Sequence, residues 1–456
     1  MKSEMNMTVG SVPLTLFRFA LPTFFANLLQ SFYNMADMLV VGQLVGSAGV
    51  AAISNASTLV FLINAICLGV TTGGAVLIAQ YKGAGNQNGQ KETMGTLYTL
   101  MGVLAGLITL SGLALYQVIL QAMNVPAKSM SDAEDYMVVI LCGTIFVFGY
   151  NTTCSILRGG GDVTSPLLFV GMATVLNVLL DYLLVGGWGM GTVGAAYATV
   201  LSQGVSFFLS IWYLKRRDFL FDFNIRSFAI KKTIAASVLK ISLPTAIQMA
   251  VVNVSYLLIA AMLNEYGVTV AAAAGIGLKI NTFAGMPCWA VGSAITAMAA
   301  QNMGAGLTDR VKKVCVAGVT INLAITLLAV IVVQEFSEEL VMVFDTDPAV
   351  ISAGTAYLRI CCFGNSLVYA GMYGFDSFAV GVGAAPIAMI NALLDSVFIR
   401  LPLCFMLRGF FLEGYEGVFW GQALSPILPA LIGGVYFLLG GWKRKKLVDR
   451  NSQGEG

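Results

Sequence analysis

The sequence predicts an all-α integral membrane protein with twelve transmembrane helices, arranged as two pseudo-symmetric lobes of six. Composition is the first reason, because 57% of the residues are hydrophobic and 11% are charged, whereas soluble domains carry about 25% charged residues. The second is a series of continuous apolar stretches, each long enough to cross a bilayer as a helix. The third is an internal repeat, since short motifs of the first half return in the second.

The repeat has a constant spacing of 221 or 222 residues. Its paired motifs are Leu21–Thr23 with Leu243–Thr245, Ala79–Gly85 with Ala300–Gly306, and Gly159–Gly161 with Gly381–Gly383. Six spans separate equivalent positions, so both lobes should have the same orientation, related by a pseudo-twofold axis along the membrane normal. Parallel repeats of this kind are typical of alternating-access carriers, although duplication is also simply a way to build a large bundle.

Six spans are expected in the first half, each of about 20 residues or more and therefore able to cross roughly 30 Å of hydrocarbon. They are at residues 13–42, 50–80, 92–120, 131–157, 163–186 and 191–214. The runs are continuously apolar, which excludes the alternating pattern of a membrane β-barrel. Pro22 lies inside the first span, where its missing backbone donor favours a bend.

A polar segment separates the halves. Residues from Lys215 to Lys240 include seven basic side chains, so we expect a cytoplasmic linker at 215–236 between a first lobe at 1–214 and a second lobe at 237–442. A basic cytoplasmic tail at 443–456 follows. The six spans of the second lobe are expected at 237–264, 270–302, 311–334, 350–379, 384–408 and 415–442.

Basic residues in short loops predict the orientation in the membrane. With the N-terminus inside, nearly all of the 25 Lys and Arg residues fall in inner segments, and the predicted outer loop at 335–347 is acidic. The exceptions are Lys128, Lys279, Arg359, Arg400 and Arg408. Both termini are therefore expected in the cytoplasm. The first apolar run is too long for a cleavable signal peptide, so we expect a multi-pass protein of the cytoplasmic (plasma or inner) membrane.

Missing residue types exclude several kinds of site. Histidine is absent, which removes His-metal sites, Ser-His-Asp triads and His proton relays. The eight cysteines all fall within predicted spans without a Cys-x-x-Cys spacing. Gly159–Asp162 lacks the Gly-Lys-Ser/Thr of a phosphate loop and is expected to form a tight inner loop. We expect no enzyme, no cofactor, no nucleic acid partner and a monomer in contact with membrane lipid.

The carboxylates in the apolar spans break the repeat. Where the first half has polar residues, the second has apolar ones: Asp37 faces Ile259, Asn177 faces Val397, and Asp181 faces Leu401. An ionisable side chain within a membrane is costly and is by default a functional hypothesis. The departure from symmetry therefore indicates the working site.

The depth of these polar residues in the membrane predicts that their side chains lie close together. Asp37 and Asp181 each lie five residues before the outer end of their spans, and Thr199 lies eight residues into the sixth, about 7–12 Å below the outer surface at 1.5 Å per residue. Asn177 and Asp181 share one helix face. Together the four residues are the predicted ion-coupling site, and the oxygens of Asn177, Asp181 and Thr199 are ligands that a small cation such as Na⁺ accepts.

The sequence leaves the ion open. In a dry pocket, desolvation favours the neutral carboxyl, so Asp37 or Asp181 would bind and release H⁺. In a wet, oxygen-rich pocket the same groups would stay ionised and hold Na⁺. The structural alternative is an aspartate that caps a helix or pairs with a buried base, but no basic residue lies at matching depth in the first lobe.

The second lobe has ionisable residues of its own: Lys279, Arg359, Asp376, Asp395 and Arg400. Asp395 and Arg400 are five residues apart on one span, so structural pairing is favoured over a contribution to gating. Lys279 is expected to snorkel or to find Asp376.

A short motif repeats out of register. Asn391–Asp395 resembles Asn177–Asp181, but its offset of 214 would place it about two turns nearer the inner end of its span. We interpret this echo as a coincidence.

Polar and adaptable side chains suggest a substrate pocket. Gln30, Tyr33, Asn34 and Asn151 add polar groups to spans one and four. Methionines and the 27 Phe, 16 Tyr and five Trp residues supply apolar and aromatic walls. Such a lining suits small amphipathic organic cations.

At this point the chain resembles the multidrug and toxic compound extrusion (MATE) family over residues 10–442. The matching pieces are the Leu-Pro openings of spans one and seven, Tyr33–Asp37, Ala79–Gly85, Leu157–Asp162, Asn177–Asp181 and Gly194–Thr199. The resemblance implies a twelve-helix, V-shaped antiporter that exports cationic drugs against H⁺ or Na⁺. In the DinF-like prokaryotic branch, the ion site maps to Asp37, Asn177, Asp181 and Thr199.

One departure from the family favours the first-lobe site. Other branches carry a glutamate in span seven, eight residues after the proline, where this chain has Val252 followed by Asn253. We therefore expect multidrug efflux by ion antiport through the first lobe. A flippase or exporter of a lipid-linked or endogenous metabolite is the alternative, and a membrane enzyme is disfavoured.

Overall fold

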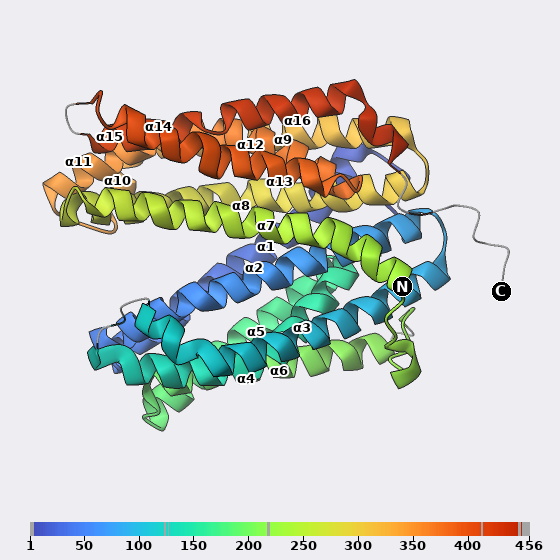
Figure 1. The fold of residues 1–456 in the computed structure, drawn as a ribbon, viewed down its shortest axis with the longest axis horizontal. Coiled ribbons are helices and arrows are strands. Elements are labelled where there is room, and N and C mark those ends of the chain that lie inside the picture. The colour runs from blue at the N-terminus through green and yellow to red at the C-terminus, as the bar shows by residue number, and fades with distance from the viewer. Residues whose placement is uncertain are drawn as a thin grey trace. The chain divides into compact units, whose positions relative to one another are not determined.

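The computed structural model describes residues 4–122, 125, 127–216, 219–411, 414–445 and 448, and all of its regular structure in these ranges is helical (Figure 1). Most of the predicted basic tail, from Lys446 onward apart from one residue, lies outside the described residues. Lys2, Arg217 and the side chain of Lys128 lie outside them too. The expected all-helical fold class is confirmed for the described part of the chain.

Each span predicted in the first half is a helix in the structure. Their bounds are α1 Val12–Leu44, α2 Ser47–Gly83, α3 Gln87–Ala122, α4 Ala127–Gly159, α5 Thr164–Asp181 continued by the π-helix η1 Tyr182–Gly187, and α6 Gly191–Arg216. Long apolar runs give long helices here because a helix satisfies every backbone polar group within one segment.

The second half repeats this order with more interruptions. Its elements are α7 Lys232–Asn264, α8 Val268–Gly304, α9 Thr308–Glu335, α10 Ser337–Met342, α11 Pro348–Tyr357, η3 Leu358–Ser366, α12 Leu367–Gly381, α13 Ala385–Leu393, η4 Leu394–Ile399, α14 Arg400–Leu407, α15 Tyr415–Leu424, α16 Ile427–Leu439 and η5 Gly441–Arg444. Within the described residues, eleven helices are long and apolar enough to cross a membrane. The span predicted at 350–379 is instead divided among α11, η3 and α12, which follow one another directly.

The chain forms two compact units, and each unit is made of two separate stretches of the sequence. One unit contains the residues up to Asn6 and Phe25–Ser242, and the other contains Met7–Phe24 and the residues from Leu243 onward. Both α1 and α7 therefore change units close to their Leu-Pro-Thr motifs. Pro22 and Pro244 lie inside these two helices, at the points where the unit membership changes.

Backbone geometry shows the repeat at the starts of α2 and α8. Gly46 precedes α2 with φ 92° and ψ −171°, and Gly267 precedes α8 with φ 94° and ψ 176°. Only glycine adopts this region without steric cost. The same turn is thus built at equivalent places in both halves, 221 residues apart.

The predicted linker packs against its own unit. Tyr98 of α3 lies 5.8, 6.0 and 5.9 Å, centroid to centroid, from Phe221, Phe223 and Phe228. Phe223 has a positive φ of 52°, which costs backbone energy. The Ser227 hydroxyl and the Asn224 amide both hydrogen-bond the Asp222 carboxylate, which holds the pKa of that group below its usual range. The linker is therefore an ordered part of the first unit.

Candidate functional site

The outer halves of four helices meet in the first unit. Val41 of α1, Met137 of α4, Val185 of η1 and Ala195 of α6 belong to one buried apolar cluster. Lipid tails are as apolar as these side chains, so close van der Waals packing, and not transfer from water, holds the helices together here. The cluster fixes the backbone beside the predicted polar residues.

The two predicted carboxylates lie side by side within this packing. Asp37 is 7% exposed and Asp181 is fully buried, and their carboxyl groups are near enough to interact directly. Asn177, one helical turn before Asp181, is fully buried as well. The structure thus brings Asp37, Asn177 and Asp181 into one secluded place, as the depth argument predicted.

These side chains have unmet hydrogen-bonding capacity. In the described part of the chain, Asp37 Oδ1, both Asp181 oxygens, and both the oxygen and the nitrogen of the Asn177 amide are buried without a hydrogen-bond partner. Buried polar atoms in folded proteins are nearly always paired with protein, water or an ion. A concentration of orphaned oxygens on adjacent carboxylates indicates a place that binds something.

Among the described residues, no basic side chain forms an ion pair with Asp37 or Asp181. The four ion pairs found among the described residues join Lys82 with Glu4, Lys231 with Glu92, Arg400 with Asp395 and Arg408 with Glu265. Neither Asp37 nor Asp181 takes part in any of them. The alternative that the first-lobe aspartates serve in structural salt bridges therefore has no support in the described residues.

Hydroxyl groups complete the surroundings of the carboxylates. Tyr33 of α1 is buried close to Asp37 and faces the hydroxyls of Thr199 and Ser202 on α6. Tyr136 of α4 is also buried and lies close to both aspartates. Tyr33, predicted as a substrate-binding residue, therefore lies beside the predicted ion-coupling set.

Two of these neighbours were missed by the sequence reasoning. Ser202 lies three residues after Thr199, on the same face of the sixth span, and Tyr136 lies five residues into the fourth span, at the depth of Asp37. The same counting of depth and helix face would have found both.

The other predicted substrate-binding residues differ in their exposure. Gln30 is half-buried and Asn34 is exposed on α1. Asn151 on α4 is half-buried, and its Nδ2 donates to the Val147 carbonyl at 2.9 Å. Their role in substrate binding stays a prediction.

The local helix geometry changes at the site. The π-helix η1 begins directly after Asp181, and Trp188 N donates to the Leu183 carbonyl at 2.9 Å to close it. Single π-helical turns are rare and occur frequently at functional positions. Asp181 is therefore the last α-helical residue before a wider turn.

The second unit has a different set of buried charges. Arg400 pairs with Asp395, so the expected structural pairing is confirmed. Asp376 Oδ1 accepts from Asn391 Nδ2 at 2.6 Å. Lys279 is exposed and forms none of the ion pairs of the described residues, so it does not pair with Asp376.

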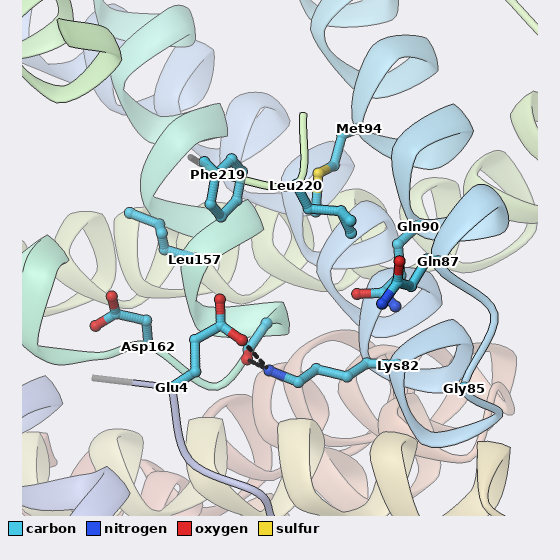
Figure 2. Close-up of a pocket in the computed structure, with 11 residues that line it drawn as sticks. Glu4, Lys82, Gly85, Gln87, Gln90, Met94, Leu157, Asp162, Phe219 and Leu220 are labelled. Atoms are coloured by element: carbon cyan, nitrogen blue, oxygen red, sulfur yellow. Dashed lines mark hydrogen bonds and ion pairs between the residues drawn. The ribbon is translucent and has the colours of Figure 1, made fainter. Parts of the chain in front are cut away.

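A pocket of about 220 Å³ lies at the predicted inner end of the first unit (Figure 2). Lys82 donates to Glu4 at 2.7 Å and to the Gly160 carbonyl. Asp162 accepts from the backbone N–H of Ser165 at 3.0 Å and from its hydroxyl at 2.7 Å, at the start of α5. The charges that line this pocket have partners within the protein, in contrast to Asp37 and Asp181.

The neighbouring inner loop has the tight form predicted for it. Gly161 adopts a φ of 84°, and a Cβ added there would lie 2.7 Å from the Met5 carbonyl oxygen. Met5 N donates to the Gly161 carbonyl at 3.1 Å. The glycines of this loop thus serve backbone geometry, and the prediction of a tight loop in place of a phosphate site is consistent with these contacts.

The chain is similar to known membrane transporters along nearly its whole length. The MatE family model matches residues 22–183 and 244–406, once in each half, which confirms the internal repeat. The "Probable multidrug resistance protein YpnP" of Bacillus subtilis is 28% identical over 97% of this chain and 98% of its own length. The "FAD transporter" of Shewanella oneidensis is 23% identical over 94% and 95%.

Solved structures show the same fold. The "Outward-facing conformation of a multidrug resistance MATE family transporter of the MOP superfamily" has a TM-score of 0.90 and 21% identity, covering 96% of this chain and 98% of its own. The family match extends over most of the chain and over both repeats. The chain belongs to the MatE family of multidrug transporters, and it is a multi-pass membrane transporter and not an enzyme.

Proposed function

We propose that the protein is a secondary active antiporter of the cytoplasmic membrane, with both termini inside. It exports cationic, amphipathic organic compounds in exchange for H⁺ or Na⁺, by alternating access of its two lobes. Asp37 and Asp181 are the coupling carboxylates, with Asn177 and Thr199 as further ion ligands. One observation carries the proposal: two adjacent buried carboxylates have orphaned oxygens and no basic partner among the described residues.

Electrostatics explains why this pair would bind an ion. Two like unit charges about 4 Å apart repel by about 4 kcal/mol at an effective dielectric constant near 20. Burial adds the desolvation cost of each charge. A proton on either group, or a Na⁺ between them, removes most of this cost. The amide oxygen of Asn177 and the hydroxyl of Thr199 are suitable additional ligands for Na⁺.

Ion binding then favours one arrangement of α1 and α5 over another. With the ion bound, the carboxyl groups can stay together, and without it they repel. Asp37 lies about four helical turns after Pro22 on the same helix, and a proline inside a helix removes one backbone hydrogen bond. A change at Asp37 can therefore be accommodated by bending at Pro22, which links the ion cycle to the movement of the lobe.

The cargo class rests on the family and on the composition of the spans. The printed names of relatives include multidrug resistance and multidrug export proteins, and aromatic and Met residues give a wall that adapts to different shapes. The second candidate is an exporter of an endogenous metabolite or a flippase of a lipid-linked one. One relative is named a FAD transporter, which is the observation that favours it.

Reconstituted protein tests the coupling. Proteoliposomes loaded with a cationic dye are given an imposed pH gradient or an imposed Na⁺ gradient, and dye movement is followed by fluorescence. We expect one gradient to drive transport, and Asp37→Asn or Asp181→Asn to lower the driven rate at least about tenfold, or ~1.4 kcal/mol. Asp135→Asn is the matched control, since Asp135 is an exposed carboxylate of α4.

The outcomes separate the candidates. Retained gradient-driven transport in folded Asp37→Asn and Asp181→Asn proteins would refute the assignment of the coupling residues. If organic cations are not transported by the wild type, but FAD or a lipid-linked precursor moves across the same membranes, the metabolite candidate replaces the drug exporter.

A further inference from the structure

The second unit contains a counterpart of the proposed ion site. In the repeat register, α7 corresponds to α1, the run α13, η4 and α14 corresponds to α5 and η1, and α15 with α16 corresponds to α6. At offsets of 222 or 223 the paired residues are Tyr33 with Ser255, Thr199 with Gln422, and Ser202 with Ser425. Three of the four spans that surround Asp37 and Asp181 therefore have equivalents around Asp395.

At this counterpart the chain supplies its own cation. Asp395 and Arg400 are both fully buried, and Arg400 Nη2 lies 2.5 Å from Asp395 Oδ2. Ser425 Oγ donates to Asp395 Oδ1 at 2.6 Å, and Arg400 Nε donates to Ser425 Oγ at 3.2 Å. The guanidinium also lies over the Tyr256 ring, 4.9 Å from its centroid. Both oxygens of this carboxylate have partners, unlike those of Asp181.

The π-helix η4 creates this pair. Five residues along an α-helix place two side chains about 140° apart, whereas a π-helix joins residue i to residue i+5. Arg400 N donates to the Asp395 carbonyl, which closes one π turn. The same two residues are therefore joined twice, by this backbone hydrogen bond and by the ion pair of their side chains. Ser255 Oγ of α7 donates to the Ser396 carbonyl at 2.8 Å within this turn. The wider turn, the ion pair and α7 are thus held in one arrangement.

The out-of-register motif Asn391–Asp395 includes the carboxylate of this pair. In the repeat register Val397 faces Asn177 and Leu401 faces Asp181, so Asn391–Asp395 lies six residues before the matching positions. Six residues turn an α-helix by about 240° beyond one full turn, so the two motifs do not share a helix face. The structure shows Asp395 in contact with Ser425 of the span that corresponds to α6. The interpretation of the echo as a coincidence is unchanged, and the contact with Ser425 carries the comparison of the two places.

We infer that Arg400 is a tethered cation that permanently fills the second-lobe counterpart of the ion site, so that ion exchange takes place in the first lobe alone. This inference rests on the proposed function of Asp37 and Asp181. A guanidinium stays charged at all physiological pH values, and its covalent attachment prevents it from leaving. Asp395 is therefore neutralised throughout the cycle, whereas the first-lobe carboxylates depend on an ion from outside.

The surroundings of the pair agree with a filled site. Among the described residues, the other titratable groups close to Arg400 include Tyr256, Tyr357, Tyr369, Cys361 and Cys404, none of which supplies a mobile cation. Orphaned buried atoms beside the pair include the donors Arg400 Nη1 and Gln422 Nε2, which would repel a cation. Asp376 is the other buried carboxyl of this unit, it is held by Asn391, and its own orphaned Oδ2 makes it a necessary control.

The test counts cations bound per molecule. Purified protein in lipid nanodiscs is titrated with radioactive Na⁺, and H⁺ uptake is measured in parallel in weakly buffered solution. We expect Asp181→Asn to remove wild-type binding. Arg400→Gln frees Asp395 and should add a further cation per molecule, and Asp395→Asn/Arg400→Gln should return the count to the wild-type value. Asp376→Asn should leave the wild-type count unchanged.

Several outcomes would overturn the inference. One is a folded Arg400→Gln protein that binds no additional Na⁺ or H⁺, and another is an Asp181→Asn protein that still binds at the wild-type count. Where Arg400→Gln alone does not fold, the double variant decides. It should retain gradient-driven efflux close to wild type, and a folded double variant that has lost the response to the gradient contradicts the inference.

The proposed coupling site and the inference about Arg400 are tested by different measurements, so one can be refuted without the other. If Asp37→Asn and Asp181→Asn leave driven efflux unchanged, the proposed coupling site is wrong. The additional cation of Arg400→Gln is measured by binding, without transport, so its presence or absence still decides whether Arg400 fills a cation site.

Discussion

The two lobes treat a buried carboxylate in opposite ways. In the first, Asp37 and Asp181 lie together with orphaned oxygens and no basic partner among the described residues. In the second, Asp395 is bound by Arg400 and Ser425, which occupy both its oxygens. The scaffold is the same in both, since the spans correspond one to one. Chemistry at a few positions therefore decides which lobe is a candidate for ion exchange and which is structural.

The difference is large in energy. A buried charge that loses its partner destabilises a fold by about 3–5 kcal/mol, although an intact buried pair is close to neutral compared with apolar residues. At Asp395 the second lobe avoids this cost through Arg400. The first lobe retains it until an ion binds, so the free energy of ion binding is available for conformational change. An unsatisfied site is thus what a coupling mechanism requires.

The largest effect is expected when the ion pair of Asp395 and Arg400 in the second lobe is broken. Arg400→Met should lower the free energy of unfolding by about 3–5 kcal/mol, because Asp395 then remains buried without a counter-charge. Asp395→Asn/Arg400→Met should recover most of that loss, since no uncompensated charge is left. Thermal unfolding in detergent, followed by tryptophan fluorescence, measures both. A double variant as unstable as the single one would show that packing of the arginine stem, and not charge, is responsible.

A smaller effect is expected from ion binding to the first lobe. An ion that binds only the folded protein stabilises it by about 2.7 kcal/mol at a concentration 100 times its dissociation constant. The melting temperature of the wild type should therefore rise either with added Na⁺ or, in Na⁺-free buffer, as the pH is lowered. Asp37→Asn and Asp181→Asn should abolish this rise, and Asp135→Asn should keep it. Equal rises in all four proteins would indicate a non-specific salt or acid effect.

The spans and the first-lobe site were predictable because they depend on one-dimensional properties. Apolar length defines a membrane helix, and counting residues from the ends of two spans places Asp37 and Asp181 at one depth. Helix face then adds Asn177. The same depth and helix face apply to Tyr136 and Ser202, so these hydroxyl groups are predictable from the sequence as well.

The rest depended on local backbone geometry. Nothing in the pattern of apolar residues predicts the π-helices after Asp181 and at Asp395, because inserting a wider turn changes the hydrogen bonding and not the composition. That turn decides that Arg400 reaches Asp395. The division of the span at 350–379 among α11, η3 and α12 was missed for the same reason.

The smallest expected effects come from one equivalent pair of residues. Ser255 donates a hydrogen bond to the Ser396 carbonyl at 2.8 Å, so Ser255→Ala should cost about 1 kcal/mol of stability and leave cation binding unchanged. Tyr33, its counterpart, has a buried hydroxyl without a hydrogen-bond partner in the described residues. Removing a group that makes no such bond loses little, so Tyr33→Phe should change stability by less than about 0.5 kcal/mol.

Tyr33→Phe and Ser255→Ala should differ in their affinity for the cation. Because the Tyr33 hydroxyl lies beside Asp37, Thr199 and Ser202, its removal should weaken cation binding by roughly threefold to tenfold, up to about 1.4 kcal/mol. Na⁺ titration and proton uptake of both variants in nanodiscs measure this against the wild type. If Ser255→Ala weakened cation binding as much as Tyr33→Phe, the second lobe would take part in ion exchange, and the contrast between a filled and an open site would fail.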